Sequence, residues 1–260
     1  TSLILVPIVA SLGYIIPKTS SRAITDPAGT ADRAEMLMPV SLSIKKIKHV
    51  ISKAGGCIVW GGAINLAPAD DIIISAERPL SLDSFLITSI IAKKYAVGSR
   101  YVVIDMPLGR NAKIKNINVC KKLFRQFKAI GKKLGMKINA VVTNASQHLG
   151  TTVGPALEAK EVLEVLTRKD CEIDFVRKAC YLSAVIFNMV RGIDIEDGIE
   201  LAIKTIKQGK AEKKLREIIK AQGGNPRINP SDIEVGGYSK EFRSERCGYI
   251  TKVNIQSIKT

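Results

Sequence analysis

Several classes of protein are excluded by what the sequence lacks. Only 5% of the 260 residues are aromatic, so a platform on which nucleic-acid bases could stack is not predicted. No run of eighteen apolar residues occurs, and no membrane-spanning helix is therefore expected. The apolar opening, residues 1–10, has neither the basic leader nor the small-residue cleavage site of a signal peptide, and it has no initial methionine. We therefore expect Thr1 to lie inside a longer protein.

Cysteine and histidine are also scarce. The five cysteines form no Cys-x-x-Cys pair and are odd in number, which argues against zinc ligation and a disulfide framework. We predict five small buried side chains in a reducing cytoplasm, and no metal site. The two histidines, His49 and His148, have no nucleophile in a motif beside them, so a hydrolase triad gains no support. The cysteines are Cys57, Cys120, Cys171, Cys180 and Cys247.

Positive charge is abundant, with 40 Lys and Arg against 24 acidic residues and a net charge of +16. Such a field attracts polyanions, so a basic nucleic-acid-binding protein without catalysis is one hypothesis. The cations, however, alternate with apolar positions in helical runs such as residues 121–135, a pattern typical of a solvated helix face. A small phosphorylated substrate would benefit from the same field, and we expect no nucleic-acid partner.

Hydrophobic periodicity predicts an alternation of strands and helices. Helices are expected over residues 1–13, 30–37, 43–54, 83–97, 116–134, 155–168, 174–191, 195–207 and 211–222. Strands are expected at 57–60, 101–105 and 138–143, with a short apolar run at 14–17 and short strands in the last thirty residues. Polar loops follow the strands, so the pattern predicts an α/β sheet with ligands bound beyond the carboxyl ends of its strands.

A loop rich in hydroxyl groups is predicted over residues 18–32, before a helix that starts near Thr30. Hydroxyls, a guanidinium and the free N–H groups of a helix start together favour an anion such as phosphate. An ordinary loop, capped by Thr30 or Asp32, explains the same composition. The residues alone leave both readings open. The side chains concerned are Thr19, Ser20, Ser21, Arg22, Thr25 and Thr30.

Three further segments could carry chemistry. Residues 61–71 hold two glycines and Asp70–Asp71, which could bind a metal or a base, although a tight turn fits the spacing better. The helix expected from Asp83 places Ser89 and Lys93 four residues apart on one face, while Asp83 itself is typical of a helix cap. Residues 109–113 form a cationic loop at the end of a predicted strand.

Taken together, these segments resemble a known family. The strings KTSSRAITDPAGTAD, IVWGGAINLAPADD, LITSIIAKK with VGSRYVVIDMPLGRNAK, and TTVGPALEAKEVLEVL are similar, in order and at nearly the same spacing, to the thymidine phosphorylase and AMP phosphorylase family. The resemblance implies an α/β, two-lobed protein with a mixed sheet. It implies a large phosphate-binding lobe (residues 1–65 and 98–260, β-rich over 232–260) and a segment of a helical base-binding lobe (residues 66–97).

The resemblance also implies a reaction. Phosphate attacks the anomeric carbon of a ribose, and the base leaves. Ala76 stands where the thymidine-specific members have a base-binding arginine, which favours the archaeal AMP-type branch. The implied activity is AMP + phosphate to adenine + ribose 1,5-bisphosphate, and the alternative is a pyrimidine nucleoside phosphorylase. Phosphate is then a substrate, no cofactor is needed, and the expected assembly is a cytoplasmic homo-oligomer, at least a dimer.

Roles for individual residues follow from the same resemblance. Asp83 is implied as the proton donor to the leaving base, and Lys93 as a base-side residue. Ser2, Ser20 and Thr30 are implied to bind phosphate. If the interpretation is right, the hydroxyl-rich turn and the helix after Asp83 flank one ribose. Nucleotide contacts are implied for Ser21, Arg22, Ala23, Ile24, Thr25, Asp26, Thr30, Ser89 and Lys113.

Overall fold

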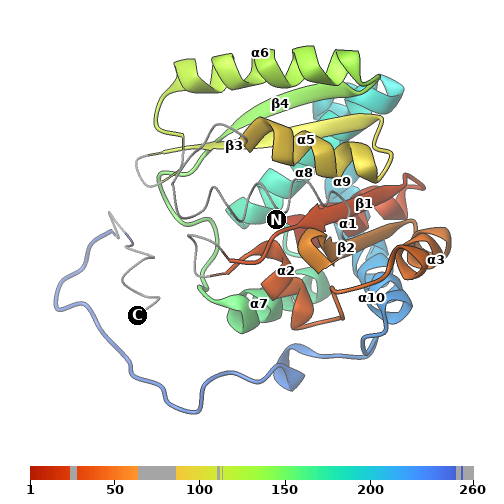
Figure 1. Cartoon of the computed structure of the whole chain (residues 1–260). Coiled ribbons are helices and arrows are strands. Elements are labelled where there is room, and N and C mark those ends of the chain that lie inside the picture. The colour runs from red at the N-terminus through yellow and green to blue at the C-terminus, as the bar shows by residue number, and fades with distance from the viewer. Residues whose placement is uncertain (24–27, 64–85, 110–111, 113, 250–252, 254–260) are drawn as a thin grey trace.

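Two short parallel sheets organise the molecule in the computed structural model, which describes residues 1–23, 28–63, 86–109, 112, 114–249 and 253 (Figure 1). In the first sheet, β1 (Ile16–Ser20) pairs with β2 (Gly56–Trp60); in the second, β3 (Tyr101–Leu108) pairs with β4 (Lys137–Asn144). The predicted α/β class is confirmed. Both pairs are parallel, so the described residues show no antiparallel pair of the mixed sheet that the resemblance implied.

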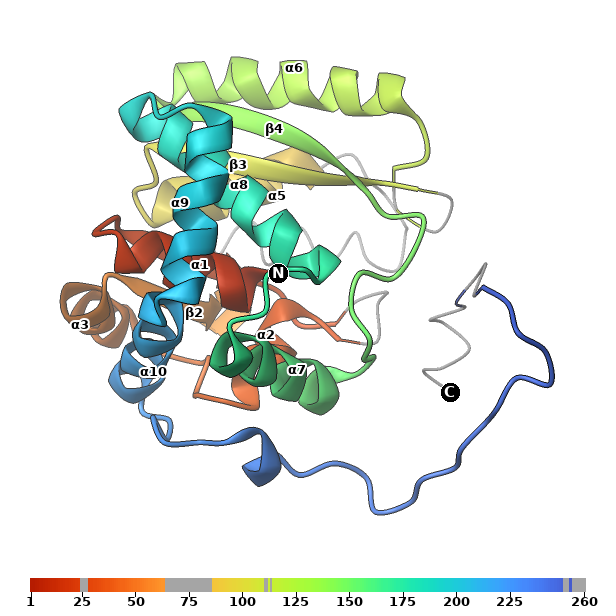
Figure 2. The ribbon, with the colours of Figure 1, turned by 180° about the vertical axis from the view of Figure 1, so that it is seen from behind.

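Helices surround the first sheet and form the larger core with it. α1 (Ser2–Ser11) is apolar on nearly every side and packs against α10 (Lys210–Gln222), α8 (Asp174–Arg191) and β2. α2 (Thr30–Glu35) packs on α7 (Pro155–Arg168), and α3 (Ile44–Ala54) covers β2. α9 (Ile195–Lys207) pairs with α8 behind the sheets, as Figure 2 shows. Burial of Ile4, Phe187 and Leu215 marks the centre of this core.

The second sheet has its own smaller core. α6 (Ile117–Lys133) lies along one face of β3 and β4, and α8 packs on both strands (Figures 1 and 2). α5 (Leu86–Ala96) packs against α6 and contributes Ile91 to the cluster that holds Ile104 and Phe127. The cations of α6 point to solvent, which confirms the solvated face predicted for residues 121–135.

Helix ends follow the sequence closely because the caps are local. Ser43 caps α3 by accepting a hydrogen bond from the Lys46 N–H, and Gly55 ends the helix in a left-handed conformation with φ 73°. Asn116 caps α6 in the same way through the Asn118 N–H. The predicted bounds of α7, α8 and α9 are confirmed. None of the helices in the described ranges combines the length and apolar character that a bilayer crossing requires.

Two predictions differ from the structure near the C-terminus. The described part of the last thirty residues contains no strand: a short 3-10 helix, Pro230–Asp232, is followed by an exposed extended chain. An alternating pattern needs a neighbouring strand for its hydrogen bonds, and no strand lies beside residues 234–249 in the described structure. Cys247 is exposed there, whereas the other four cysteines are buried as predicted.

Candidate functional site

The site is built where β1 and β2 end side by side. Ser20 is in register with Trp60 at the carboxyl ends of the two parallel strands. The chain therefore leaves β1 through Ser21 and Arg22 next to Gly61, which follows β2. The loop predicted from residue 18 starts only after Ser20, because Lys18 and Thr19 belong to the strand. Parallel strands direct the groups that follow them to one edge, where ligands commonly bind.

The start of α2 folds back onto this strand end. The Ala31 N–H donates to the Ser21 carbonyl at 3.2 Å, and a methyl group on Gly29 would lie 2.4 Å from that same oxygen. Only glycine allows so close an approach of the two backbones. Thr30 is the first residue of α2, so the structure brings together the backbone of three residues predicted to bind an anion, Ser20, Ser21 and Thr30. The Ser20 hydroxyl donates to the Val59 carbonyl at 3.5 Å.

Arg22 is held by two carboxylates and an aromatic ring. Its guanidinium donates to both oxygens of Glu35, at 2.5 and 2.7 Å, and to Asp32 Oδ1 at 3.1 Å. The guanidinium carbon lies 4.7 Å from the centre of the Trp60 ring. The hydrogen bond from Arg22 lowers the pKa of Glu35, and the hydrogen bond to Glu35 raises the pKa of Arg22. Charge on Arg22 is thus already matched within the protein.

Asp32 also closes the turn. Its Oδ2 accepts the backbone N–H groups of Ala23 and Gly29, at 2.7 and 2.8 Å. Burial alone would raise the pKa of Asp32, but these two hydrogen bonds, together with Arg22, lower it on balance. The carboxylate therefore joins the residue before the segment 24–27 to a residue just after it. Sequence reasoning had suggested Asp32 only as a possible helix cap.

Helix α5 reaches the same edge of the sheet. A methyl group on Gly61 would lie 3.6 Å from Lys93 Cδ and 3.7 Å from the Ser20 carbonyl oxygen, so Lys93 lies close to the end of β1. Ser89, one turn earlier on α5, is 9% exposed. The hydroxyl-rich turn and the predicted base-side helix therefore share one edge.

A second lysine of α5 was missed. Lys94 Nζ donates to the carbonyl oxygen and the hydroxyl of Thr19, at 3.2 and 2.8 Å. Burial, with the neighbouring charges of Lys18 and Lys93, lowers the pKa of Lys94 to about 7. Burial also lowers the pKa of Lys18, against the opposing charge of Asp105 on β3. The edge therefore gathers three lysines, Lys18, Lys93 and Lys94, whose protonated forms suit an anionic ligand.

Asp105 connects the second sheet to this region. It accepts a hydrogen bond from the Thr143 hydroxyl at 2.6 Å and forms an ion pair with Lys178 of α8 at 2.6 Å. Ser2 is the first residue of α1, and the N-terminal end of the chain lies near the middle of the molecule (Figures 1 and 2). No hydrogen bond in the described part of the chain joins Ser2 to Ser20 or Thr30.

Several predicted residues lie outside the described ranges. They include the proposed proton donor, Asp83, and one predicted nucleotide contact on the cationic loop, Lys113. The full set is Ile24, Thr25, Asp26, Asp70, Asp71, Ala76, Asp83 and Lys113.

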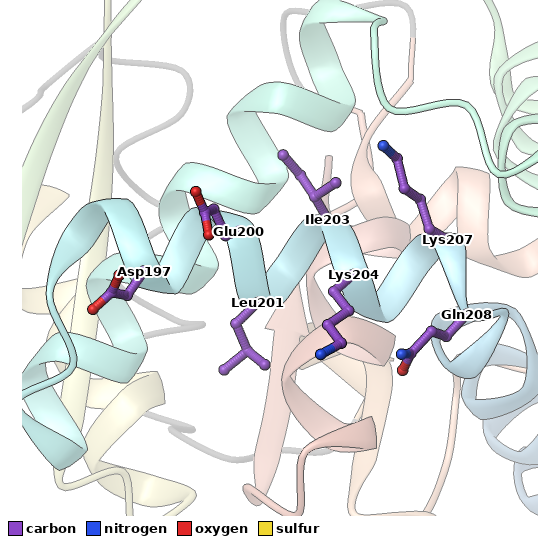
Figure 3. A pocket seen from close by; sticks show the side chains of 7 residues that line it. All are labelled: Asp197, Glu200, Leu201, Ile203, Lys204, Lys207 and Gln208. Atoms are coloured by element: carbon purple, nitrogen blue, oxygen red, sulfur yellow. The ribbon is translucent and has the colours of Figure 1, made fainter.

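A different depression runs along α9 (Figure 3). It has a volume of about 660 Å³ and is lined by residues of this helix and its end: Asp197, Glu200, Leu201, Ile203, Lys204, Lys207 and Gln208. Its acidic side chains, Asp197 and Glu200, lie toward the start of the helix and its basic ones, Lys204 and Lys207, toward its end, and none of the predicted site residues lines it. Among the described residues, no group of three or more His, Cys, Asp or Glu side chains is placed to hold a metal ion.

Three residues that sequence reasoning missed share one property. Glu35, Trp60 and Lys94 each contact a residue that is distant in sequence and that only the fold brings close. Periodicity offers one usable signal, because Asp32 and Glu35 are three residues apart and therefore share a face of α2. It does not reveal that Arg22 lies opposite them.

Comparison with known proteins gives one consistent result. The chain is 51% identical to the AMP phosphorylase of Thermofilum pendens, over 96% of this chain and 48% of that protein. It is 45% identical to the AMP phosphorylase of Pyrococcus furiosus (99% of this chain, 52% of that protein) and 46% identical to that of Methanococcus vannielii (99% and 51%). The chain therefore spans about half the length of the curated relatives it matches.

One solved structure is similar in fold. The anthranilate phosphoribosyltransferase of Thermus thermophilus superposes with a TM-score of 0.67, covering 85% of this chain and 72% of that one, at 13% identity. At that identity the likeness concerns the fold alone. No family model matches the chain. Across nearly all of its own length, and about half of theirs, the chain thus matches the sequences of the AMP phosphorylases.

Proposed function

We propose that the full-length protein catalyses the phosphorolysis of nucleoside 5′-monophosphates, converting AMP and phosphate to adenine and ribose 1,5-bisphosphate. The observation that carries the proposal is the convergence at Gly61. There the hydroxyl-rich turn after β1 meets α5, in a chain 42–51% identical to proteins named AMP phosphorylase. One edge thus offers hydroxyls for an anion and a lysine for the leaving base, the two needs of this reaction.

The proposed reaction requires binding groups from both the turn after β1 and helix α5. As the bond to the base breaks, the ribose becomes oxocarbenium-like, and a phosphate oxygen must stand close to C1′. The hydroxyls of Ser20, Ser21 and Thr30 are proposed to bind the anionic groups of the substrates; the backbone bond from the Ala31 N–H to the Ser21 carbonyl, which holds the start of α2 against the end of β1, supports this proposal. Lys93 and Ser89 are proposed to contact the base from α5. These contacts help most where they are stronger in the transition state than in the ground state.

Protonation of the leaving base completes the mechanism. We propose Asp83 as the general acid, because it precedes the helix that brings Lys93 to the site. A positioned proton donor contributes roughly 10²–10⁴ in rate. Residues 24–26 and Lys113 are proposed as further nucleotide contacts. No cofactor takes part in the proposed reaction, in which inorganic phosphate is consumed.

A direct assay tests the proposal. The full-length protein is incubated with AMP, with and without phosphate, and adenine is measured by chromatography. Adenine release that requires phosphate is expected, and its absence would overturn the proposal. Parallel assays with CMP, uridine and thymidine address the alternative, a pyrimidine nucleoside phosphorylase. Faster turnover of the nucleosides than of AMP would favour that alternative, because it does not need the 5′-phosphate.

The location and assembly of the enzyme are also part of the proposal. Four buried free thiols suit a reducing compartment, so we infer a cytoplasmic location. The family resemblance supports a homo-oligomer, at least a dimer. Light scattering coupled to size-exclusion chromatography of the full-length protein would measure its mass, and a monomer at micromolar concentration would contradict the inference.

A further inference from the structure

The turn that carries the proposed anion-binding hydroxyls is fixed by a compact network of charged groups. Arg22 contributes two nitrogens to Glu35 and one of them also to Asp32, at distances of 2.5 to 3.1 Å. An arginine that binds a carboxylate through two parallel hydrogen bonds is fixed in orientation as well as in position. The same guanidinium stacks on Trp60, the last residue of β2.

This network joins three pieces of backbone. Asp32 of α2 binds the N–H groups of Ala23 and Gly29. The side chain of Arg22, the residue next to Ser21, binds Glu35 of the same helix. Trp60 adds the end of β2 to the assembly. The backbone that carries Ser20, Ser21 and Thr30 is therefore held by contacts of the residues beside them, while the Ser20 hydroxyl itself donates to the Val59 carbonyl at 3.5 Å.

The charges argue against Arg22 as a direct ligand of a substrate anion. Two carboxylates face one guanidinium, so an incoming phosphate would meet a local excess of negative charge at Arg22. To bind Arg22, the phosphate would have to displace Glu35, a bidentate partner.

We propose that Glu35 and Arg22 are positioning residues of the site, which hold the turn of Ser20, Ser21 and Thr30 in its binding geometry. This inference rests on the proposed function and revises the role of Arg22 within it, from a nucleotide ligand to a brace. Displacement of binding groups by ~1 Å can cost on the order of 10² in rate, so loss of the brace should reduce catalysis although neither residue touches substrate.

The first variant distinguishes a positioning role of Glu35 from competition between Glu35 and the substrate for Arg22. In the full-length protein, Glu35→Gln keeps the size of the side chain and removes its charge. If Glu35 braces Arg22, the KM for phosphate or AMP rises and kcat/KM falls by roughly 10- to 100-fold. If Arg22 binds the substrate directly, Glu35→Gln frees it, and the KM for the anion falls. A fall in KM would overturn the proposal.

A matched control excludes the general effect of losing an ion pair. Glu172→Gln removes the partner of Arg177 in an exposed pair on α8 and the preceding loop, far along the chain from the turn. It should leave both KM values unchanged. Thermal unfolding of both variants is measured in parallel, because a merely structural role of Glu35 would lower the unfolding temperature and leave the KM values of the folded enzyme unchanged. That result would also contradict the proposal.

A double-mutant cycle completes the test. If the two residues act only through each other, Arg22→Gln, Glu35→Gln and the double variant share similar KM values. Additive effects on log KM would show that Arg22 also contacts substrate on its own. Arg22→Lys should behave like Arg22→Gln, since lysine cannot form the bidentate contact; wild-type kinetics in Arg22→Lys would contradict the brace.

Failure of the proposed function gives a different signature. If the wild-type protein releases no base, the brace is tested by calorimetric titration with inorganic phosphate alone. Weaker phosphate binding by Glu35→Gln than by Glu172→Gln would then support the brace without the reaction. Equal binding by the two variants would overturn it.

Discussion

Lys94 and Thr19 join the two sides of the candidate site. The lysine, near the end of α5, donates to both the carbonyl and the hydroxyl of a threonine on β1 that is 4% exposed. The helix that carries the base-side residues is thereby tied to the strand that leads into the hydroxyl-rich turn. Residues 75 positions apart meet at this contact, so it could not be predicted from local pattern.

The same contact predicts a dependence of stability on pH. The pKa of Lys94 is lowered to about 7 in the folded protein, by burial and by the charges of Lys18 and Lys93, whereas the unfolded chain retains the ordinary lysine value of 10.5. Between these values the unfolded state binds a proton that the folded state does not. The free energy of unfolding therefore rises with pH from about 7 to about 10, by at most about 1.4 kcal/mol per pH unit from this group.

Comparison of variants isolates that contribution. The Lys94→Met variant lacks the titrating group. Its free energy of unfolding, measured with urea, should therefore rise less than that of the wild type between pH 7 and 9.5. Lys122→Met, on the exposed face of α6, should retain the wild-type slope. Parallel curves for the wild type and Lys94→Met would show that Lys94 keeps an ordinary pKa.

The helices and strands that can be predicted from the sequence are those stabilised by residues close by in the chain. Caps such as Ser43 and Gly55 lie next to the helix they define, so helix bounds were predicted well. The strand through Lys18 to Ser20 was missed because polar residues there are stabilised by pairing with β2, which lies about forty residues away. The strands predicted near the C-terminus are absent from the described residues. The alternating pattern there suits a strand, but no neighbouring strand is present to pair with it.

The candidate site was predicted in part for a similar reason. Residues adjacent in sequence, such as Ser20 and Ser21, can be grouped from composition and from the resemblance to known motifs. The partners of Arg22 cannot be predicted in this way, because a guanidinium in a hydroxyl-rich loop looks the same whether it faces a ligand or a carboxylate. Glu35 lies 13 positions away, and only the fold shows that it is the partner.

Gly29→Ala should damage the site through packing alone. The φ of Gly29 is −84°, which alanine adopts freely, so no backbone strain is introduced. The new methyl group would, however, lie 2.4 Å from the Ser21 carbonyl and 2.5 Å from the carbonyl carbon of Arg22. Overpacking of this kind costs about 1–3 kcal/mol, and relief of the clash must move the turn away from α2.

Two measurements check this expectation. Denaturant unfolding should show the loss of stability, and phosphate KM should rise in the full-length enzyme. Gly236→Ala serves as the control, because a methyl group there meets nothing within 4 Å. Wild-type stability and KM in Gly29→Ala would mean that the approach of α2 to Ser21 is looser than the structure indicates.

Asp83→Asn should separate chemistry from binding. Asparagine has nearly the same shape as aspartate but cannot donate an acidic proton, so kcat should fall by roughly 10²–10⁴ while the KM values change little. Steady-state kinetics of the full-length protein with AMP test this, and circular dichroism checks that the fold is kept. Unchanged turnover would assign protonation of the base to another group.

Gln222 supports the strand beneath the site from within the core. Its side chain is 2% exposed and serves Ile58 as a strand neighbour would. The amide oxygen, Oε1, accepts the Ile58 N–H at 2.8 Å, and Nε2 donates to the Ile58 carbonyl at 3.0 Å and to the Pro39 carbonyl at 2.7 Å. One side chain thus bonds three backbone groups, two of them on the buried Ile58, and its removal offers a test of the fold.

Gln222→Met keeps the length of the side chain but leaves those three groups without these partners. Each unsatisfied group costs about 1–3 kcal/mol, so the free energy of unfolding, measured with denaturant, should fall by several kcal/mol. Gln126→Met, on the exposed face of α6, should change it by no more than about 0.5 kcal/mol. Because β2 ends at Trp60, on which Arg22 stacks, Gln222→Met should also weaken phosphate binding. Equal stability of the two methionine variants would mean that water satisfies Ile58 in place of the glutamine.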